Sequence, residues 1–156
     1  MSENNLYNMA LNKAMSLCSG REYCIEDIAV KLQLWGVAKN DSEKIIATLL
    51  KENFINEQRY ADAFTRDKFR YNKWGKVKIS AHLRAKKISS EIIRSALDRI
   101  DNELYRTFIK DLLTTHRRTV KAKNKYDLKG KLLRFGLSKG FESEILYDLL
   151  NDLKEE

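Results

Sequence analysis

Residues 42–50 read SEKIIATLL, and similar stretches return as SEIIRSAL at residues 90–97 and SEILYDLL at residues 143–150. Each stretch begins with a Ser-Glu pair, and apolar residues then follow at spacings of three and four. Such spacing is typical of an amphipathic helix that buries one face. The three stretches therefore predict three related helices that stand at similar intervals along the chain.

A second repeated feature precedes each of these helices. It consists of three-residue segments that stand 51 and then 53 positions apart: WGV at 35–37, KKI at 86–88 and KGF at 139–141. A diverged repeat of about fifty residues fits both features. The first copy carries about four extra residues, 38–41, between the two features.

The chain has 156 residues, no proline and only six glycines. It thus lacks the commonest helix breaker and most of the turn residues that β-sandwiches and barrels need. Apolar spacing indicates three short helices in each copy of the repeat. Because a short helix triplet cannot bury its apolar faces alone, we predict an all-α fold of three tandem three-helix repeats stacked into an elongated or curved array. A compact single bundle is the alternative. The predicted units are residues 1–55, 56–101 and 102–156.

Several helix ends are predicted from local signals. Gly20 and Gly36 stand where the first two helices would end, in positions that favour a left-handed backbone. Asn40 and Glu43 resemble a capping box that opens the third helix. Ser89 or Ser90 is placed to cap the sixth helix.

Positive charge is concentrated in one block of the sequence. The chain carries 30 Lys and Arg against 22 Asp and Glu, a formal net charge of +8. Residues 1–65, 66–134 and 135–156 carry net charges of −2, +14 and −4, respectively. A uniform solubilising coat would be spread more evenly, so the distribution favours a polyanionic partner.

Two basic clusters lie within that block, and we predict that they contact DNA or acidic surfaces of a partner. Solvated helix faces with extended lysine stems are the alternative. Tyr71 and Trp74 lie among the first cluster, where they would either stack on nucleic-acid bases or pack into a neighbouring helix. Lys68 and Lys86 also belong to the first cluster. The residues predicted to make contact are Arg66, Arg70, Lys73, Lys76, Lys78, Arg84 and Lys87, and, in the second cluster, Arg117, Arg118, Lys121, Lys123 and Lys125.

The sequence gives little support for catalysis. Glycine-rich phosphate loops and the common hydrolase and zinc-protease motifs are missing. His82 and His116 have no carboxylate close in sequence to orient them as bases. Glu57, Asp62 and Asp67 could in principle bind Mg²⁺, but neighbouring arginines favour local ion pairs. We therefore expect a protein that is not an enzyme and has no cofactor or metal.

Compartment and redox state are predicted from what the sequence lacks. No apolar run approaches the roughly 18 to 20 residues of a membrane span. The first residues do not resemble a secretory signal. We therefore expect a cytoplasmic protein without a membrane partner. Cys18 and Cys24 are the only cysteines, and their spacing predicts two buried or half-buried thiols rather than a zinc or redox site.

Residues 56–88 carry a family signature. Asn56 and Glu57 stand just before Arg59-Tyr60-Ala61, an aromatic residue follows three positions after the alanine, and a basic helix, a glycine and an Ile-Leu pair four apart come next. This pattern resembles the central signature of the RecX family, modulators of the RecA recombinase. Asn56, Lys76, His82 and Lys87 depart from the residues that the family usually has. The signature positions here are Glu57, Arg59, Tyr60, Ala61, Phe64, Gly75, Ile79, Leu83 and Ile88.

The resemblance implies a non-enzymatic regulator that binds in the helical groove of the RecA filament on single-stranded DNA. It would span adjacent protomers and inhibit ATP hydrolysis, strand exchange and coprotease activity. We expect it to act as a monomer, with duplex DNA as a further candidate partner. The apolar signature residues are predicted to form the core of the second unit, with Glu57 and Arg59 as a cap and its partner. A general DNA- or RNA-binding module and a protein-interaction repeat without nucleic acid are the alternatives.

Overall fold

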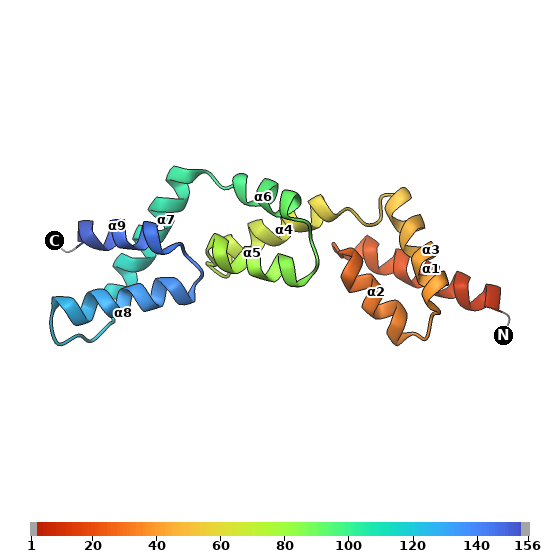
Figure 1. Ribbon diagram of the computed structural model, residues 1–156, viewed down its shortest axis with the longest axis horizontal. Helices are drawn as coiled ribbons and strands as arrows, with labels where there is room; N and C mark the ends of the chain where they lie inside the picture. Colours follow the sequence, from red (N-terminus) through yellow and green to blue (C-terminus); the bar gives the residue numbers. More distant parts are fainter. Residues whose placement is uncertain (1–2, 154–156) are drawn as a thin grey trace. The chain divides into compact units, whose positions relative to one another are not determined.

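The computed structural model describes residues 3–153, and over this range the chain forms nine α-helices and no strands (Figure 1). The predicted all-α class is confirmed. The helices follow one another through short turns, and the lack of proline and the apolar spacing favour helices of this kind. Their bounds are α1 (Glu3–Gly20), α2 (Ile25–Leu34), α3 (Lys39–Lys51), α4 (Glu57–Arg70), α5 (Lys76–Ala85), α6 (Ser90–Asp98), α7 (Asn102–Arg117), α8 (Lys125–Ser138) and α9 (Ser143–Leu153).

The chain divides into two compact units. The first comprises Met1–Ala63 and Leu83–Ile93, and the second comprises Phe64–His82 and Arg94–Glu156. Each unit therefore contains one complete helix triplet and part of the middle one. The division into three units at residues 55 and 101 stays a prediction.

In the first unit, α1 and α2 both pack against α3. Ile28 and Leu32 are one helical turn apart on α2, and Ile45 and Leu49 are one turn apart on α3. All four are buried in one cluster with Ala14 of α1. The predicted apolar stripes are thus the packed faces of these helices.

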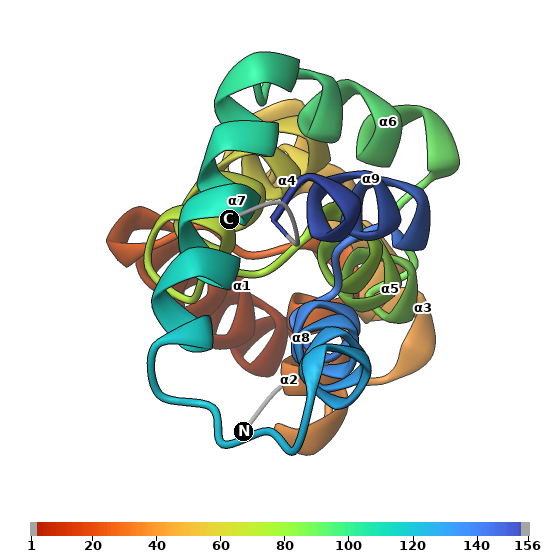
Figure 2. The ribbon, with the colours of Figure 1, turned by 90° about the vertical axis from the view of Figure 1, so that its left-hand side faces the viewer.

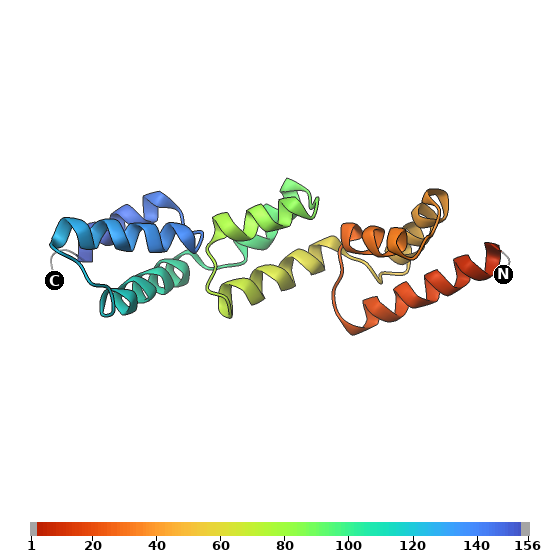
Figure 3. The ribbon, with the colours of Figure 1, turned by 90° about the horizontal axis from the view of Figure 1, so that it is seen from below.

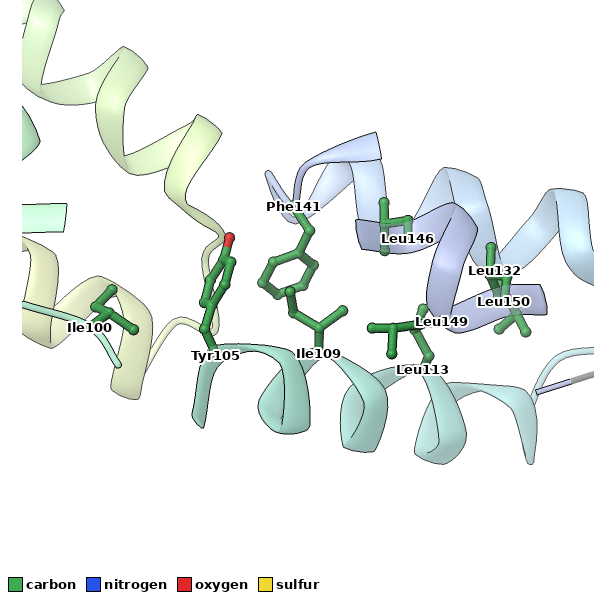
Figure 4. Close-up of a cluster of buried hydrophobic side chains, with 9 residues drawn as sticks. All are labelled: Ile100, Tyr105, Ile109, Leu113, Leu132, Phe141, Leu146, Leu149 and Leu150. Atoms are coloured by element: carbon green, nitrogen blue, oxygen red, sulfur yellow. The ribbon is translucent and has the colours of Figure 1, made fainter. Parts of the chain in front are cut away.

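In the second unit, α7, α8 and α9 pack against one another. Tyr105, Ile109 and Leu113 repeat every four residues and form the buried face of α7. Figure 4 shows these side chains pointing toward α8 and α9, from which Leu132 and Leu146 point back. The blue and cyan helices of Figure 3 are this packed triplet.

The repeated three-residue segments adopt one conformation. Their central residues Gly36, Lys87 and Gly140 have φ angles of +80°, +62° and +90°. In each segment the next residue donates its backbone N–H to a carbonyl five positions earlier, which is the Schellman motif that ends a helix. These bonds are Val37 to Leu32 (3.0 Å), Ile88 to Leu83 (3.2 Å) and Phe141 to Gly136 (3.1 Å). The repeat inferred from spacing is therefore also a repeat of backbone geometry.

Other helix ends differ in part from the local predictions. Ser89 caps α6, since its hydroxyl accepts from the Ile92 N–H at 3.4 Å. Gly36 has the predicted left-handed conformation, but Gly20 is the last residue of α1. The capping box at Asn40 is wrong, because α3 begins at Lys39 with Ala38 as its N-cap, two residues earlier than predicted.

Candidate nucleic-acid interface

Trp74 is the centre of a packed group of rings on α4 and α5. Its ring centroid lies 6.2 Å from that of Phe64 and 4.5 Å from that of His82. The ammonium groups of Lys68 and Lys78 lie 4.9 and 4.7 Å from the Trp74 centroid. Trp74 is half-buried in this group, so its ring is engaged within the protein.

Further lysines of the first basic cluster also lie over rings. Lys73 Nζ is 5.9 Å from the Phe108 centroid, and Lys76 Nζ is 4.7 Å from the Tyr105 centroid. Cation–π contacts of this kind hold an ammonium group in place without cancelling its charge. These lysines are therefore both structural residues of the second unit and sources of its positive potential.

The arginines of the first cluster are exposed. Arg66 lies 3.6 Å from Asp67 in an exposed ion pair, which contributes little to stability. Arg70 and Arg84 are exposed. Tyr71, at the end of α4, is 72% exposed. The structure thus places part of the first cluster in solvent, where it is accessible to a partner.

Lys86 and Lys87 contact the start of α2 in the first unit. Lys86 Nζ lies 2.7 Å from Asp27 Oδ1, and Lys87 Nζ lies 3.4 Å from Glu26 Oε2. Partial burial raises the pKa of Asp27, but hydrogen bonds from Lys86 and from Cys24 outweigh it and leave the pKa below its usual value. The same bond raises the pKa of Lys86. Lys87, predicted as a contact residue, therefore already has an acidic neighbour.

Glu57 and Arg59 have structural roles that differ from the predicted one. Asn56 caps α4, since its Oδ1 accepts from the Arg59 N–H at 2.9 Å. Glu57 instead accepts from the backbone N–H of Ile25 at 3.3 Å, at the start of α2. Arg59 Nε lies 2.6 Å from Glu22 Oε2. Glu57 thus holds the start of α2, and Arg59 joins the α1–α2 connection to the carbonyls of Asn53 and Phe54 before α4.

The apolar signature residues lie in the protein interior. Phe64 is half-buried. The remaining five are buried: Tyr60, Ala61, Ile79, Leu83 and Ile88. This burial agrees with a structural role, but Phe64 and Ile79 belong to the second compact unit and the other four to the first, so a common core of residues 56–101 stays a prediction.

Gly75 permits a close backbone approach in the second unit. Its N–H donates to the Lys139 carbonyl at 2.7 Å, and the Val77 N–H donates to the Gly140 carbonyl at 3.0 Å. A Cβ at Gly75 would meet the Gly140 carbonyl and the Phe141 ring. Only glycine fits between these groups, which explains the glycine of the signature.

Tyr105 joins the same region, and sequence analysis missed this role. Its hydroxyl accepts from the Lys76 N–H at 2.9 Å and donates to Glu142 Oε1 at 2.5 Å. Burial, together with the bond to Glu142, raises the pKa of Tyr105. The sequence held a signal for a buried tyrosine here. Tyr105 is the fourth residue of α7, and the signature residue Tyr60 is the fourth residue of α4.

The second basic cluster lies at the end of α7 and in the loop before α8, drawn in cyan in Figure 2. Arg117 is half-buried, and Arg118, Lys121, Lys123 and Lys125 are exposed. The ring of His116 stacks on that of Phe135, with centroids 3.8 Å apart and planes at 9°. This contact fixes the end of α7 against α8. The structure therefore gathers these cations on one short segment.

The possible catalytic residues do not come together. Glu57 accepts from Ile25, Asp62 accepts from Gln58 at 2.9 Å and Asp67 pairs with Arg66. In residues 3–153 no three His, Cys, Asp or Glu side chains are grouped as metal ligands. Across the same residues, no helix has the length and apolarity needed to cross a membrane.

Both cysteines are free thiols, as predicted. Cys18 is half-buried and Cys24 is buried. Burial raises the pKa of Cys24 to about 11 and also raises that of Cys18. Neither environment is that of an activated nucleophile, because such a thiol has a lowered pKa.

Comparison with known proteins gives consistent matches. Residues 56–97 match the family model for the second three-helix domain of RecX. The regulatory protein RecX of Clostridium beijerinckii is 33% identical over 122 residues, which cover 77% of this chain and 56% of that protein. The RecX of Acinetobacter baylyi is 25% identical, with 92% of this chain and 87% of that protein covered. The match to the Clostridium beijerinckii protein thus spans little more than half the length of that relative.

Two solved structures share the fold. A crystal structure of a regulatory protein RecX superimposes with a TM-score of 0.87 at 23% identity, covering 96% of this chain and 73% of that one. RecX from Lactobacillus salivarius superimposes with a TM-score of 0.85 at 20% identity, covering 98% of this chain and 99% of that one. The fold is therefore that of all-helical proteins that contain three-helix domains. The chain belongs to the RecX family of regulatory proteins.

Proposed function

We propose that this protein regulates a RecA recombinase by binding its filament on single-stranded DNA and inhibiting ATP hydrolysis, strand exchange and coprotease activity. The match of residues 56–97 to the RecX domain carries the proposal. The net charge of +14 over residues 66–134 supports it, since a nucleoprotein filament is a polyanion. The relatives are named regulatory proteins, which supports a non-enzymatic role, and the proposed place of action is the cytoplasm.

The proposed mechanism is occupation of the filament groove. A protein bound there excludes the second DNA duplex, which would account for loss of strand exchange. It also favours one arrangement of neighbouring RecA protomers, and a ligand that prefers one state of a cycling assembly slows the cycle. The exposed cations Arg66, Arg70 and Arg84 are proposed to contact the filament, together with the α7–α8 loop.

RecA ATPase on single-stranded DNA is the direct test. The protein is titrated from well below one copy per RecA, and its binding to the bare strand is measured in parallel. Inhibition at substoichiometric amounts, with weak binding to the bare strand, is the expected result. An effect that appears only when the bare strand is saturated would refute filament regulation and indicate simple competition for DNA.

The alternative, a general DNA- or RNA-binding module, rests on the same basic block. Salt separates the two, because binding that consists of several phosphate contacts weakens by roughly a thousandfold or more between 50 and 200 mM salt. A filament-specific complex retains inhibition over that range. Reversal of Arg117, Arg118 and Lys121 to Glu tests the charge assignment, since full activity of this variant would remove the second cluster from the contact surface.

A further inference from the structure

We propose that the α7–α8 loop is a binding site for single-stranded nucleic acid, with the Tyr126 ring stacked on a base and the loop cations on its phosphates. This inference deepens the proposed function by naming the partner of one surface. It also distinguishes that surface from the first basic cluster on α4 and α5.

Tyr126 is unusually accessible for an aromatic residue. It is the second residue of α8, and 89% of its surface is exposed. Exposed cations precede it along the chain: Lys123 and Lys125 directly before it, and Lys121 and Arg118 earlier in the segment. An aromatic face beside flexible cations is the combination that binds single strands, because every base has a face that can stack.

Hydrogen bonds that do not involve the side chains of these cations hold the loop in shape. Lys131 Nζ donates to the Lys121 carbonyl at 2.6 Å, and the Lys123 N–H donates to Asp127 Oδ2 at 3.0 Å. Asn124 Oδ1 accepts from the Asp127 N–H at 2.8 Å. A loop that is already ordered loses less conformational entropy when it binds.

The charges of the loop are nearly all of one sign. Asp127 is the sole acidic residue between Arg117 and Leu128, and Lys131 lies 3.4 Å from its carboxylate. The Lys123 N–H, followed by Lys131, lowers the pKa of Asp127. Within the described chain, the side chains of Arg118, Lys121, Lys123 and Lys125 form no ion pair. Their charge is therefore available to an external anion.

In the first basic cluster, most lysines already contact rings of the protein. Its indole, Trp74, is packed against Phe64 and His82, and four of its lysines lie over rings of the protein. Tyr71 is exposed there, but the ammonium group of the nearby Lys73 is directed to Phe108. Tyr71 has the exposed Arg70 beside it, whereas Tyr126 of α8 follows four exposed cations within one short segment, so the loop before α8 presents the larger group of unengaged cations.

Stacking also predicts which form of nucleic acid binds. Both faces of a base within a duplex are already covered by neighbouring bases. The Tyr126 ring can therefore stack only on a base that is not part of a duplex. The cations would bind either form. The loop should therefore favour single strands, and this preference should depend on Tyr126.

The test measures binding of a fluorescently labelled oligothymidylate and of a duplex by anisotropy, without RecA. Tyr126→Ala should weaken single-strand binding by roughly 5- to 100-fold and leave duplex binding nearly unchanged, whereas Tyr126→Phe should bind like the parent protein. Tyr147→Ala is the matched control, because Tyr147 is 49% exposed on α9. Its neighbour Asp148 lies 4.0 Å from Arg106 near the start of α7, whereas the basic loop follows the end of that helix. Unchanged thermal unfolding confirms that the variants are folded.

The cations are tested through salt. Replacing Lys121, Lys123 and Lys125 by Gln should reduce the slope of log affinity against log salt by about 2, at roughly 0.7 per phosphate contact on a single strand. Parent-like binding by Tyr126→Ala would overturn the stacking role, and parent-like binding by the lysine variant would assign the loop to a protein surface. RecA ATPase with the parent protein is scored separately. A failure there refutes the proposed function while the oligonucleotide results still decide the loop.

Discussion

Replacement of Gly75 by Ala should destabilise the protein more than its size suggests. The added Cβ would overlap the backbone of Gly140 and the ring of Phe141. Overpacking of this kind costs about 1 to 3 kcal/mol. The required shift would also stretch the backbone bonds from Gly75 to Lys139 and from Val77 to Gly140, which contribute about 0.5 to 1.5 kcal/mol each. We therefore expect a loss of about 2 to 6 kcal/mol.

Thermal unfolding followed by circular dichroism measures this loss. For a chain of this length, each kcal/mol lowers Tm by about 2 to 4 °C, so Gly75→Ala should lower it by at least about 4 °C. Gly130→Ala is the matched control, because its Cβ meets only the tip of Arg134 at 3.6 Å. It should stabilise α8 by about 1 kcal/mol through helix propensity. A Gly75→Ala protein with an unchanged Tm would refute the close-approach argument.

Three further predictions concern the first unit. The pKa of Asp27 is lowered in the folded state. Its carboxylate therefore stabilises the fold above the pKa of about 4 that it has in the unfolded chain, and this stabilisation is lost as the pH falls through the lower pKa of the folded state. Urea midpoints of the parent and Asp27→Asn should therefore differ at pH 7 and converge at about pH 2 to 3; a constant difference would contradict this. Burial raises the pKa of Cys24 to about 11, so its reaction with Ellman's reagent at pH 8 should be roughly a hundredfold slower than that of a free thiol. Lys87 has a φ of +62°, and Lys87→Gly should stabilise the fold by about 0.5 to 1 kcal/mol despite losing the exposed pair with Glu26. A destabilised glycine variant would show that this pair outweighs the backbone strain.

Local sequence signals predicted the helices well. Apolar spacing located nine helices, and the WGV, KKI and KGF segments located three equivalent helix ends. Lys87 shows why the repeat was informative. A lysine gives no reason by itself to expect a left-handed residue, but its alignment with Gly36 and Gly140 does. Repeated sequence thus supplied geometry that residue preference alone would have missed.

Contacts between distant segments could not be predicted in the same way. Glutamate is a residue type that is common in the first turn of a helix. The carboxylate of Glu57, however, accepts from the backbone N–H of Ile25, 32 positions earlier. Lys86 appeared to be one more cation of a basic cluster, but it lies 2.7 Å from Asp27, 59 positions away. The sequence shows which side chains are charged, whereas the folded structure determines which groups they contact.

The ring contacts of the two tryptophans give each compact unit its own optical probe. Trp35 lies in the first unit with Lys13 4.3 Å from its ring centroid, and Trp74 lies in the second unit among Phe64 and His82. Since the chain has two tryptophans, replacing either one by Phe leaves emission from a single unit. Coincident denaturation curves from the two variants would mean that the units unfold as one cooperative system, and separate curves would assign a stability to each.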